Sequence, residues 1–186
     1  VQIVAIFAFL WVITHTDLAL YEQLGLVSGL GVMCGTFGIN VGHELGHRKE
    51  AHERFLAKIA LMTSLYMHFY IEHNRGHHKR VSTHDDPATS RYGENVYAFW
   101  IRSIRFSYLS AWDLEQKRLE WKKLPFWSWE NEMVRFHLIQ FVWLGIIGAL
   151  FGGKALLLYM AAALMGSLLL ETVNYIEHYG LQREEV

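Results

Sequence analysis

The sequence predicts an all-α protein, a polytopic bundle of transmembrane helices with further helices at the membrane surface. Hydrophobic residues make up 52% of the 186 residues and aromatic residues 15%, which is high for a soluble domain. Uncharged apolar stretches recur at lengths near those that cross a bilayer. Lys and Arg are concentrated in some of the segments that join these apolar stretches, which is the charge asymmetry expected of a membrane protein. We expect a single domain over residues 1–186.

Four apolar segments are predicted to span the membrane. The clearest evidence is the stretch from Leu24 to Val41, which is uncharged for 18 residues. Glycines recur there at four-residue intervals, which favours close approach of a second helix rather than substrate recognition. Gly152-Gly153 predicts a turn between the last two spans. The predicted spans cover residues 1–13 (a partial span), 22–46, 132–151 and 155–177.

Two other helices are predicted to lie in the interface or on the cytoplasmic side. Residues 53–72 are apolar, but a span there would separate the histidines on its two sides by a hydrocarbon layer roughly 30 Å thick. Residues 94–121 follow the turn at Asp86-Pro87 and mix aromatic with basic side chains, which is typical of a helix at the membrane surface.

The distribution of charge predicts an orientation in the membrane. If the turns at 14–22 and 151–154 lie outside, 16 of the 17 Lys and Arg residues fall on the inner side, and only Lys154 falls outside. This asymmetry follows the positive-inside rule. The total of 17 Lys and Arg against 18 Asp and Glu gives no reason to expect nucleic-acid binding. Cys34 is the only cysteine, so neither an internal disulfide nor a CxxC zinc site is possible.

Histidines occur at the spacing of metal ligands. His43 and His47 are four residues apart, which places both imidazoles on one face of a helix. His73 and His77 repeat this spacing, and His78 adds a ligand from the next position. Imidazole suits iron, zinc, copper and nickel. These residues therefore predict a metal site at the inner face.

A further ligand candidate is His178, which the predicted topology returns to the inner face at the end of the last span. More than four histidines exceed what a tetrahedral zinc requires, so two ions of higher coordination number are favoured, with iron as the best choice. Carboxylates beside these histidines are expected to accept a hydrogen bond from the other ring nitrogen, or to be ordinary inner-face charges. They are Glu44, Glu72, Asp86 and Glu177.

Four motifs together resemble the bacterial alkane 1-monooxygenases, integral-membrane non-haem di-iron hydroxylases related to membrane fatty-acid desaturases. The motifs are Asn40-x-Gly42-His43-Glu44-Leu45-Gly46-His47-Arg48, Glu72-His73-Asn74-Arg75-Gly76-His77-His78, Asp86-Pro87-Ala88-Thr89-Ser90-Arg91-x-Gly93-Glu94 and Asn174-Tyr175-Ile176-Glu177-His178-Tyr179-Gly180-Leu181.

The resemblance implies terminal hydroxylation of medium- or long-chain n-alkanes by O₂ at two non-haem iron ions. It also implies electrons from rubredoxin and its reductase, and a multi-pass protein of the bacterial inner membrane with its site at the cytoplasmic face. By match to the motifs, the iron ligands are His43, His47, His73, His77, His78 and His178. A surface with Arg75, Lys79, Arg80, Arg102 and Arg105 is expected to attract an acidic electron donor.

The family carries a further H-x-x-H-H box after the stretch that ends at Leu181. We expect the chain to be an internal fragment that does not by itself complete the site or show activity. The sequence leaves three alternatives open. The first is an intramembrane zinc protease built on His43-Glu44-x-x-His47. The second is another di-iron desaturase or hydroxylase, and the third is a metal transporter.

Overall fold

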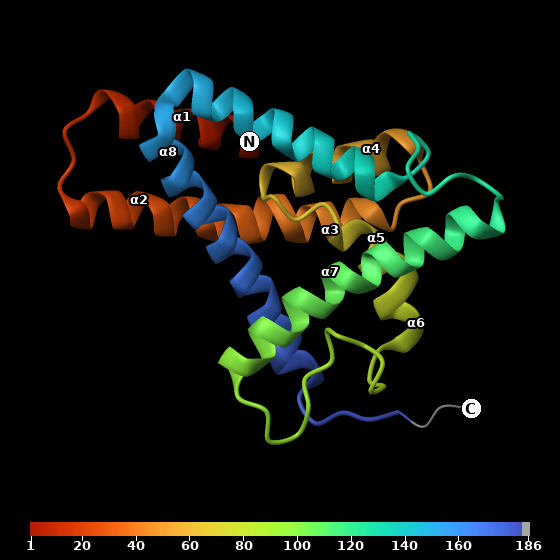
Figure 1. Ribbon diagram of the computed structural model, residues 1–186. Coiled ribbons are helices and arrows are strands. Elements are labelled where there is room, and N and C mark those ends of the chain that lie inside the picture. Colours follow the sequence, from red (N-terminus) through yellow and green to blue (C-terminus); the bar gives the residue numbers. More distant parts are fainter. Residues whose placement is uncertain (184–186) are drawn as a thin grey trace. The chain divides into compact units, whose positions relative to one another are not determined.

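The computed structural model describes residues 1–183, and these residues form helices joined by turns, with no strand among them. The prediction of an all-α fold is therefore confirmed (Figure 1). The chain divides into two compact units. Unit 1 comprises residues 1–66 and 137–169, and unit 2 comprises residues 67–136 and 170–186.

Unit 1 begins with α1 (Gln2–His15), an apolar helix that buries one stripe of its surface, including Ile6 and Leu10. The chain then turns into a long continuous helical stretch. It consists of α2 (Leu20–Met33), the π-helical segment η1 (Cys34–Asn40) and α3 (Val41–Gly46). The Glu22 carboxylate accepts a hydrogen bond from the Ala19 N–H at 2.7 Å, which supports the first turn of α2.

α4 (Ala51–Thr63) packs against this long stretch at positions where the stretch has glycine. A Cβ at Gly38 would lie only 1.8 Å from Ser64 Oγ, and one at Gly42 would lie 2.9 Å from Leu61 Cγ. Ser64 Oγ donates to the Cys34 carbonyl at 3.0 Å, inside the π-helical segment. The glycine pattern is therefore a helix-packing device, as predicted.

The helix predicted over 53–72 is interrupted. α4 ends at Thr63, and α5 (Phe69–Glu72) begins only after a turn. Leu65 in that turn has a positive φ of 54°, which a helix does not allow. Apolar residues continue through the turn, so hydropathy could not reveal it. Buried Tyr66 and Met67 show that the turn is packed rather than exposed.

α8 (Glu132–His178) is the longest helical stretch, and Asn131 caps its start by accepting from the Met133 and Val134 N–H groups. Gly152 interrupts it with φ 80° and ψ 169°, a conformation that glycine adopts readily. Figure 1 shows the sharp bend at this point. The break lies where the Gly-Gly turn was predicted.

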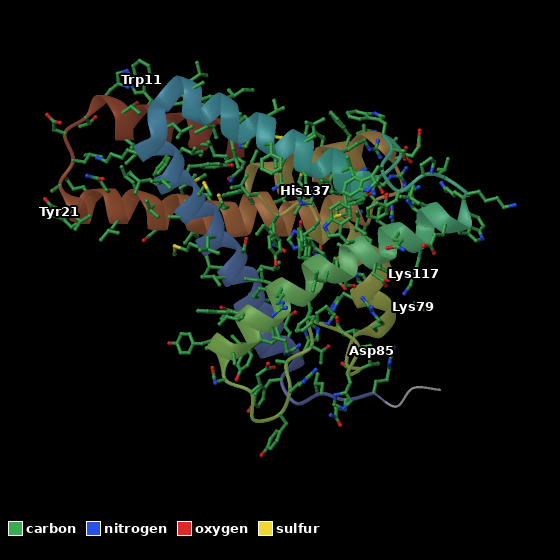
Figure 2. The ribbon with its side chains drawn as sticks, in the orientation of Figure 1. Trp11, Tyr21, Lys79, Asp85, Lys117 and His137 are labelled. Carbon is green, nitrogen blue, oxygen red and sulfur yellow. The ribbon has the colours of Figure 1, made fainter. Side chains whose placement is uncertain are left out.

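Two stretches of the described chain are long and apolar enough to cross a membrane, Leu20–Gly46 with 27 residues and Glu132–His178 with 47. The second contains the Gly152 break and so includes both of the last two predicted spans. α1 is apolar but shorter. Tyr21 projects into solvent from the start of α2, and Trp11 projects from α1 (Figure 2). Aromatic side chains at helix ends are typical of a membrane interface. The number of spans and their orientation stay predictions.

The core of unit 1 gathers apolar side chains from α1, α2 and the middle of α8 around Tyr159, which is fully buried. The Tyr159 hydroxyl donates to the Thr63 carbonyl at 2.6 Å and accepts from Trp143 Nε1 at 2.8 Å, so the buried polar atom is satisfied. The other core residues are Ile6, Phe9, Leu10, Ile13, Leu30, Cys34, Ile147, Ala155 and Ala162.

Unit 2 contains α5, the π-helical segment η2 (His73–His77), α6 (His78–Arg80), α7 (Val96–Trp121) and the end of α8. Asn95 caps α7 by accepting from the Ala98 N–H at 3.0 Å. This start lies two residues after the predicted one.

The first half of α7 packs on the end of α8 (Figure 1). Trp100 Nε1 donates to Thr172 Oγ1 at 3.1 Å. The loop between α6 and α7 lies against the same helix end, where Ser90 Oγ donates to the Tyr175 carbonyl and Tyr175 donates to the Glu94 carbonyl. These bonds fix the loop that carries Asp86-Pro87 against the segment that carries His178.

Candidate metal centre

The first histidine pair lies at the end of α3 in unit 1. His47 Nε2 is 2.9 Å from His43 Nε2, and the two rings are perpendicular. Two nitrogens bound at right angles, each about 2.1 Å from one metal ion, would lie about 3.0 Å apart. The pair therefore has the separation of two adjacent ligands of one ion. This agrees with the four-residue spacing from which the site was predicted.

The second pair, in unit 2, joins the first and last of the three histidines predicted in this segment. His78 Nε2 is 2.9 Å from His73 Nε2, with the rings 78° apart. These residues are five positions apart, and on an α-helix they would point about 140° away from each other. The π-helical turn of η2 brings them together. The four-residue spacing of His73 and His77 does not reveal this contact, because it assumes α-helical geometry; the role of all three histidines as ligands stays a prediction.

His77 instead turns toward the loop after α6. Its Nδ1 lies 2.9 Å from Asp86 Oδ2, and both side chains are buried. Asp86 also accepts from Thr89 Oγ1 and from the Ala88 N–H. With Nδ1 donating to the carboxylate, Nε2 is left as the nitrogen with a free lone pair, which is how carboxylates orient metal-binding histidines.

Burial alone would lower the pKa of His77, but the hydrogen bond and the charge of Asp86 outweigh it and raise the pKa. For Asp86, burial acts in the opposite direction and is again outweighed, because the hydrogen bonds from His77 and Thr89 hold its pKa below the usual range. Asp86 is therefore a charged acceptor for His77.

His178 lies on the last turn of α8. Its Nδ1 is 2.9 Å from the Asn174 carbonyl, so this ring too is held through Nδ1 and leaves Nε2 free. The ring centroids of His178 and His77 are 5.1 Å apart. Within unit 2 the structure thus groups four of the predicted histidines, from η2, α6 and α8: His73, His77, His78 and His178.

The other three predicted carboxylates make different contacts. Glu44 is exposed, with its carboxylate 3.4 Å from His43 Nδ1. Glu177 is exposed and has no hydrogen bond or ion pair to any residue within 1–183. Glu72 is buried and accepts from Arg80 at 2.9 Å. Burial and the charge of Asp86 raise the pKa of Glu72 to about 7, against the opposing effect of Arg80.

One carboxylate near the histidines was missed by reasoning from the sequence. Glu171 is buried in the last segment of α8, accepts from Ser103 Oγ of α7, and lies close enough to raise the pKa of His77. The signal was available, because a carboxylate inside an apolar helix is costly and usually has a specific role.

The donor set fits a metal of intermediate softness. All the paired donors are imidazole nitrogens, and two of the rings are held through Nδ1 so that Nε2 is available. Imidazole ligands suit iron, zinc, copper and nickel rather than magnesium or calcium. The histidine groups of both units are therefore chemically suited to a metal of this kind.

The sequence model of the fatty acid desaturase family matches residues 22–186. Alkane 1-monooxygenase from Pseudomonas putida is 43% identical over 176 residues, which are 95% of this chain and 44% of that protein. Alkane 1-monooxygenase from Ectopseudomonas oleovorans is 44% identical over 168 residues, 90% of this chain and 40% of that protein. The xylene/toluene monooxygenase hydroxylase component from Pseudomonas putida is 29% identical over 164 residues, 88% of this chain and 44% of that protein.

The chain thus spans less than half the length of these relatives. Because the family model covers most of the chain, the protein belongs to the fatty acid desaturase family.

Proposed function

We propose that the protein hydroxylates the terminal carbon of medium- or long-chain n-alkanes with O₂. The observation that carries this proposal is the pair of Nε2–Nε2 separations of 2.9 Å, one in each histidine group, in a chain with relatives named alkane 1-monooxygenase. Two such pairs are the donor set expected for two metal ions with open positions.

The proposed centre holds two non-haem iron ions. Its proposed ligands are His43, His47, His73, His77, His78 and His178. When bound, iron supplies the O₂ activation that a C–H bond of an alkane requires and that no amino-acid side chain provides.

The residues of the chain orient the donors. Asp86 and the Asn174 carbonyl hold the Nδ1 atoms of His77 and His178, which fixes the ring orientation and raises the basicity of the ligand nitrogen. Thr89 and the Ala88 N–H hold Asp86 in turn. These contacts hold two of the proposed ligand rings in one orientation, which reduces the reorganisation that metal binding requires.

An alkane has no polar group, so its selection depends on apolar surface and shape. We place the protein in the bacterial inner membrane, with the centre at the cytoplasmic face. Substrate then arrives from the lipid, and a soluble electron donor arrives from the cytoplasm. The two long apolar stretches and the positive-inside distribution of charge support this location.

We propose rubredoxin, reduced by its reductase, as the electron donor. The basic surface expected to attract it is smaller than the sequence indicates. Arg75 is paired with Glu115 and Glu132, Arg80 with Glu72, and Arg102 with Glu94. Lys79 and Arg105 are exposed. Charge reversal at these two positions should slow electron transfer and leave the iron content unchanged.

The test is alkane oxidation by membranes that contain the protein at the length its gene encodes, supplied with rubredoxin, its reductase and ¹⁸O₂. We expect 1-alkanols that carry the ¹⁸O label, and iron that is lost together with activity in the variants His43→Ala and His73→Ala. Unlabelled product, or activity that survives both substitutions, would refute the proposal. His52→Ala is the control, because His52 lies outside both histidine groups.

A second candidate is hydroxylation of xylene or toluene, which the similarity to the xylene/toluene monooxygenase hydroxylase component favours at lower identity. Competition between an n-alkane and p-xylene in the same assay distinguishes the two substrates. A zinc protease would need Glu44 beside the metal as its general base. The Glu44 carboxylate instead lies beside Nδ1 of His43, whereas the paired nitrogens are the Nε2 atoms, so a zinc protease is disfavoured.

A further inference from the structure

The connection between α7 and α8 exposes an unusual concentration of tryptophan. We call residues 121–131, from the last residue of α7 to the N-cap of α8, the tryptophan loop. Trp121, Trp127 and Trp129 are 83%, 78% and 65% exposed, and they are three of the seven tryptophans in the chain. A large aromatic side chain that is exposed to water leaves its apolar surface unburied. Such side chains cluster on surfaces that bind a ligand, a membrane or another protein.

The loop is held in a defined conformation. Asn131 Nδ2 donates to the Phe126 carbonyl at 2.9 Å, and Ser128 Oγ donates to the Pro125 carbonyl at 2.7 Å. Arg118 of α7 donates to the Glu130 carbonyl. The Phe126 ring packs against Trp112 of α7. The outward position of the tryptophans is therefore built into the fold.

Phe126 is half-buried between its neighbours, so the loop has an inner and an outer side. Trp127 and Trp129 alternate with Ser128 and face outward. The exposed aromatic rings of such a rigid loop can insert into an apolar environment without unfolding of the loop.

Two lysines lie on the same loop. Lys122 and Lys123 are exposed and make no ion pair with any residue in the range 1–183, and Lys123 is held in the turn with φ 56°. This contrasts with the neighbouring Arg118, which is paired with Glu115. The two positive charges are therefore available to an external anion.

The loop leads directly into α8, which starts at Glu132 and is one of the two stretches able to cross a membrane. Tryptophan is enriched where a membrane helix enters the headgroup region, because its ring is apolar and its N–H is polar. Lysine beside it is attracted to anionic headgroups.

We propose that the tryptophan loop is a membrane anchor, with Trp127 and Trp129 inserted in the headgroup region of the bilayer and Lys122 and Lys123 bound to anionic phospholipid. The anchor sets the depth at which α7 and the start of α8 lie relative to the lipid surface. It thereby holds unit 2 at the interface at which an apolar substrate leaves the lipid. The anchor itself does not depend on the proposed activity.

The test uses nitroxide labels on the protein reconstituted in lipid vesicles. Cys34 is first replaced by Ser, and a single cysteine is introduced by Trp127→Cys, by Trp129→Cys, or by Lys117→Cys as the control. Lys117 is an exposed residue of α7 (Figure 2). Power-saturation measurements then compare the accessibility of each label to O₂, which enters lipid, and to a water-soluble nickel chelate.

We expect the ratio of oxygen to nickel accessibility to be several-fold higher at 127 and 129 than at 117. Adding phosphatidylglycerol to phosphatidylcholine vesicles should raise the ratio at 127 further. The double substitution Lys122→Ser/Lys123→Ser should abolish that rise, and Lys117→Ser should not. Circular dichroism and iron content establish that each variant is folded.

Three results would overturn the proposal. One is an equal ratio at 127, 129 and 117, which would place the tryptophans in water. Another is a label at 127 shielded from both reagents, which would indicate a protein contact, such as a second copy of the chain. The third is an oxygen-to-nickel accessibility ratio that does not change when phosphatidylglycerol is added, which would show that the lysines do not bind anionic lipid.

Discussion

Arg80 and Glu72 form an ion pair that packs directly against the backbone of Gly76. Arg80 Nη2 lies 2.9 Å from Glu72 Oε1, and Ser110 of α7 hydrogen-bonds to both side chains. A Cβ on Gly76 would lie 2.5 Å from each of the two paired atoms. The pair joins the two ends of the π-helical turn, and this turn is what brings His73 next to His78.

Gly76→Ala should therefore disrupt the second histidine pair. The added methyl group would displace the ends of the Arg80 and Glu72 side chains, which weakens the contact that holds the π-helical turn. We expect a marked loss of bound iron and a changed Mössbauer spectrum of the iron that remains. Gly29→Ala is the matched control, because a Cβ there meets no atom within 4 Å.

A double-mutant cycle can separate this mechanism from general strain. In an Arg80→Gln background the ion pair is already lost, so Gly76→Ala should add little further loss of iron. Full additivity of the two substitutions would show that Gly76 acts through another contact, such as Leu114, whose Cδ1 would lie 3.0 Å from the added Cβ.

Asp86→Asn should weaken metal binding without unfolding unit 2. The amide can still accept one hydrogen bond, but it has no charge with which to hold His77 in its orientation. Loss of such a carboxylate lowers metal affinity by roughly 10–100-fold. Iron retention during titration with a chelator measures the effect. Asp85→Asn is the control, because Asp85 is exposed next to Asp86 in the chain. Equal chelator sensitivity of the two variants would contradict the assigned role.

Gly38→Ala should destabilise unit 1. The added Cβ would lie 1.8 Å from Ser64 Oγ, so the Ser64 hydroxyl must give up its hydrogen bond to the Cys34 carbonyl or α4 must shift away from η1. Overpacking of this kind costs roughly 1–3 kcal/mol. The expected result is a lower Tm of the detergent-solubilised protein, partly restored by Ser64→Ala, which removes the closest atom. Gly25→Ala should leave the Tm unchanged, since a Cβ there meets nothing within 4 Å.

The ion pair between Glu94 and Arg102 should make the stability of unit 2 depend on pH. Arg102 binds both Glu94 oxygens at 2.7 Å and also donates to the carbonyls of Pro87 and Thr89, which holds the loop that carries Asp86. The hydrogen bonds from Arg102 lower the pKa of Glu94 in the folded protein.

A carboxylate with a lowered pKa stabilises the fold above its ordinary pKa, and this stabilisation is lost as the pH falls through the lowered value. Glu94→Gln should therefore reduce the Tm at neutral pH and have little effect in acid. A Tm difference that is constant from neutral to acid pH would contradict the prediction. Glu120→Gln is the control, because Glu120 is an exposed residue of α7.

The sequence by itself determined the helical class and the apolar stretches, and it predicted which histidines hold a metal. Composition and the spacing of His43 and His47 were sufficient for this, because an α-helix places residues four apart on one face. The Gly152 turn was also visible, since consecutive glycines favour a break in a helix.

The tertiary structure decided which histidines pair in unit 2 and what holds them. Nothing in the spacing of His73, His77 and His78 distinguishes an α-helical from a π-helical turn, and only the turn that forms under the Arg80–Glu72 pair assigns His78 to His73. The partner of His77 lies nine positions away along the chain. Contacts of this kind depend on how a loop folds back, which local propensity does not specify.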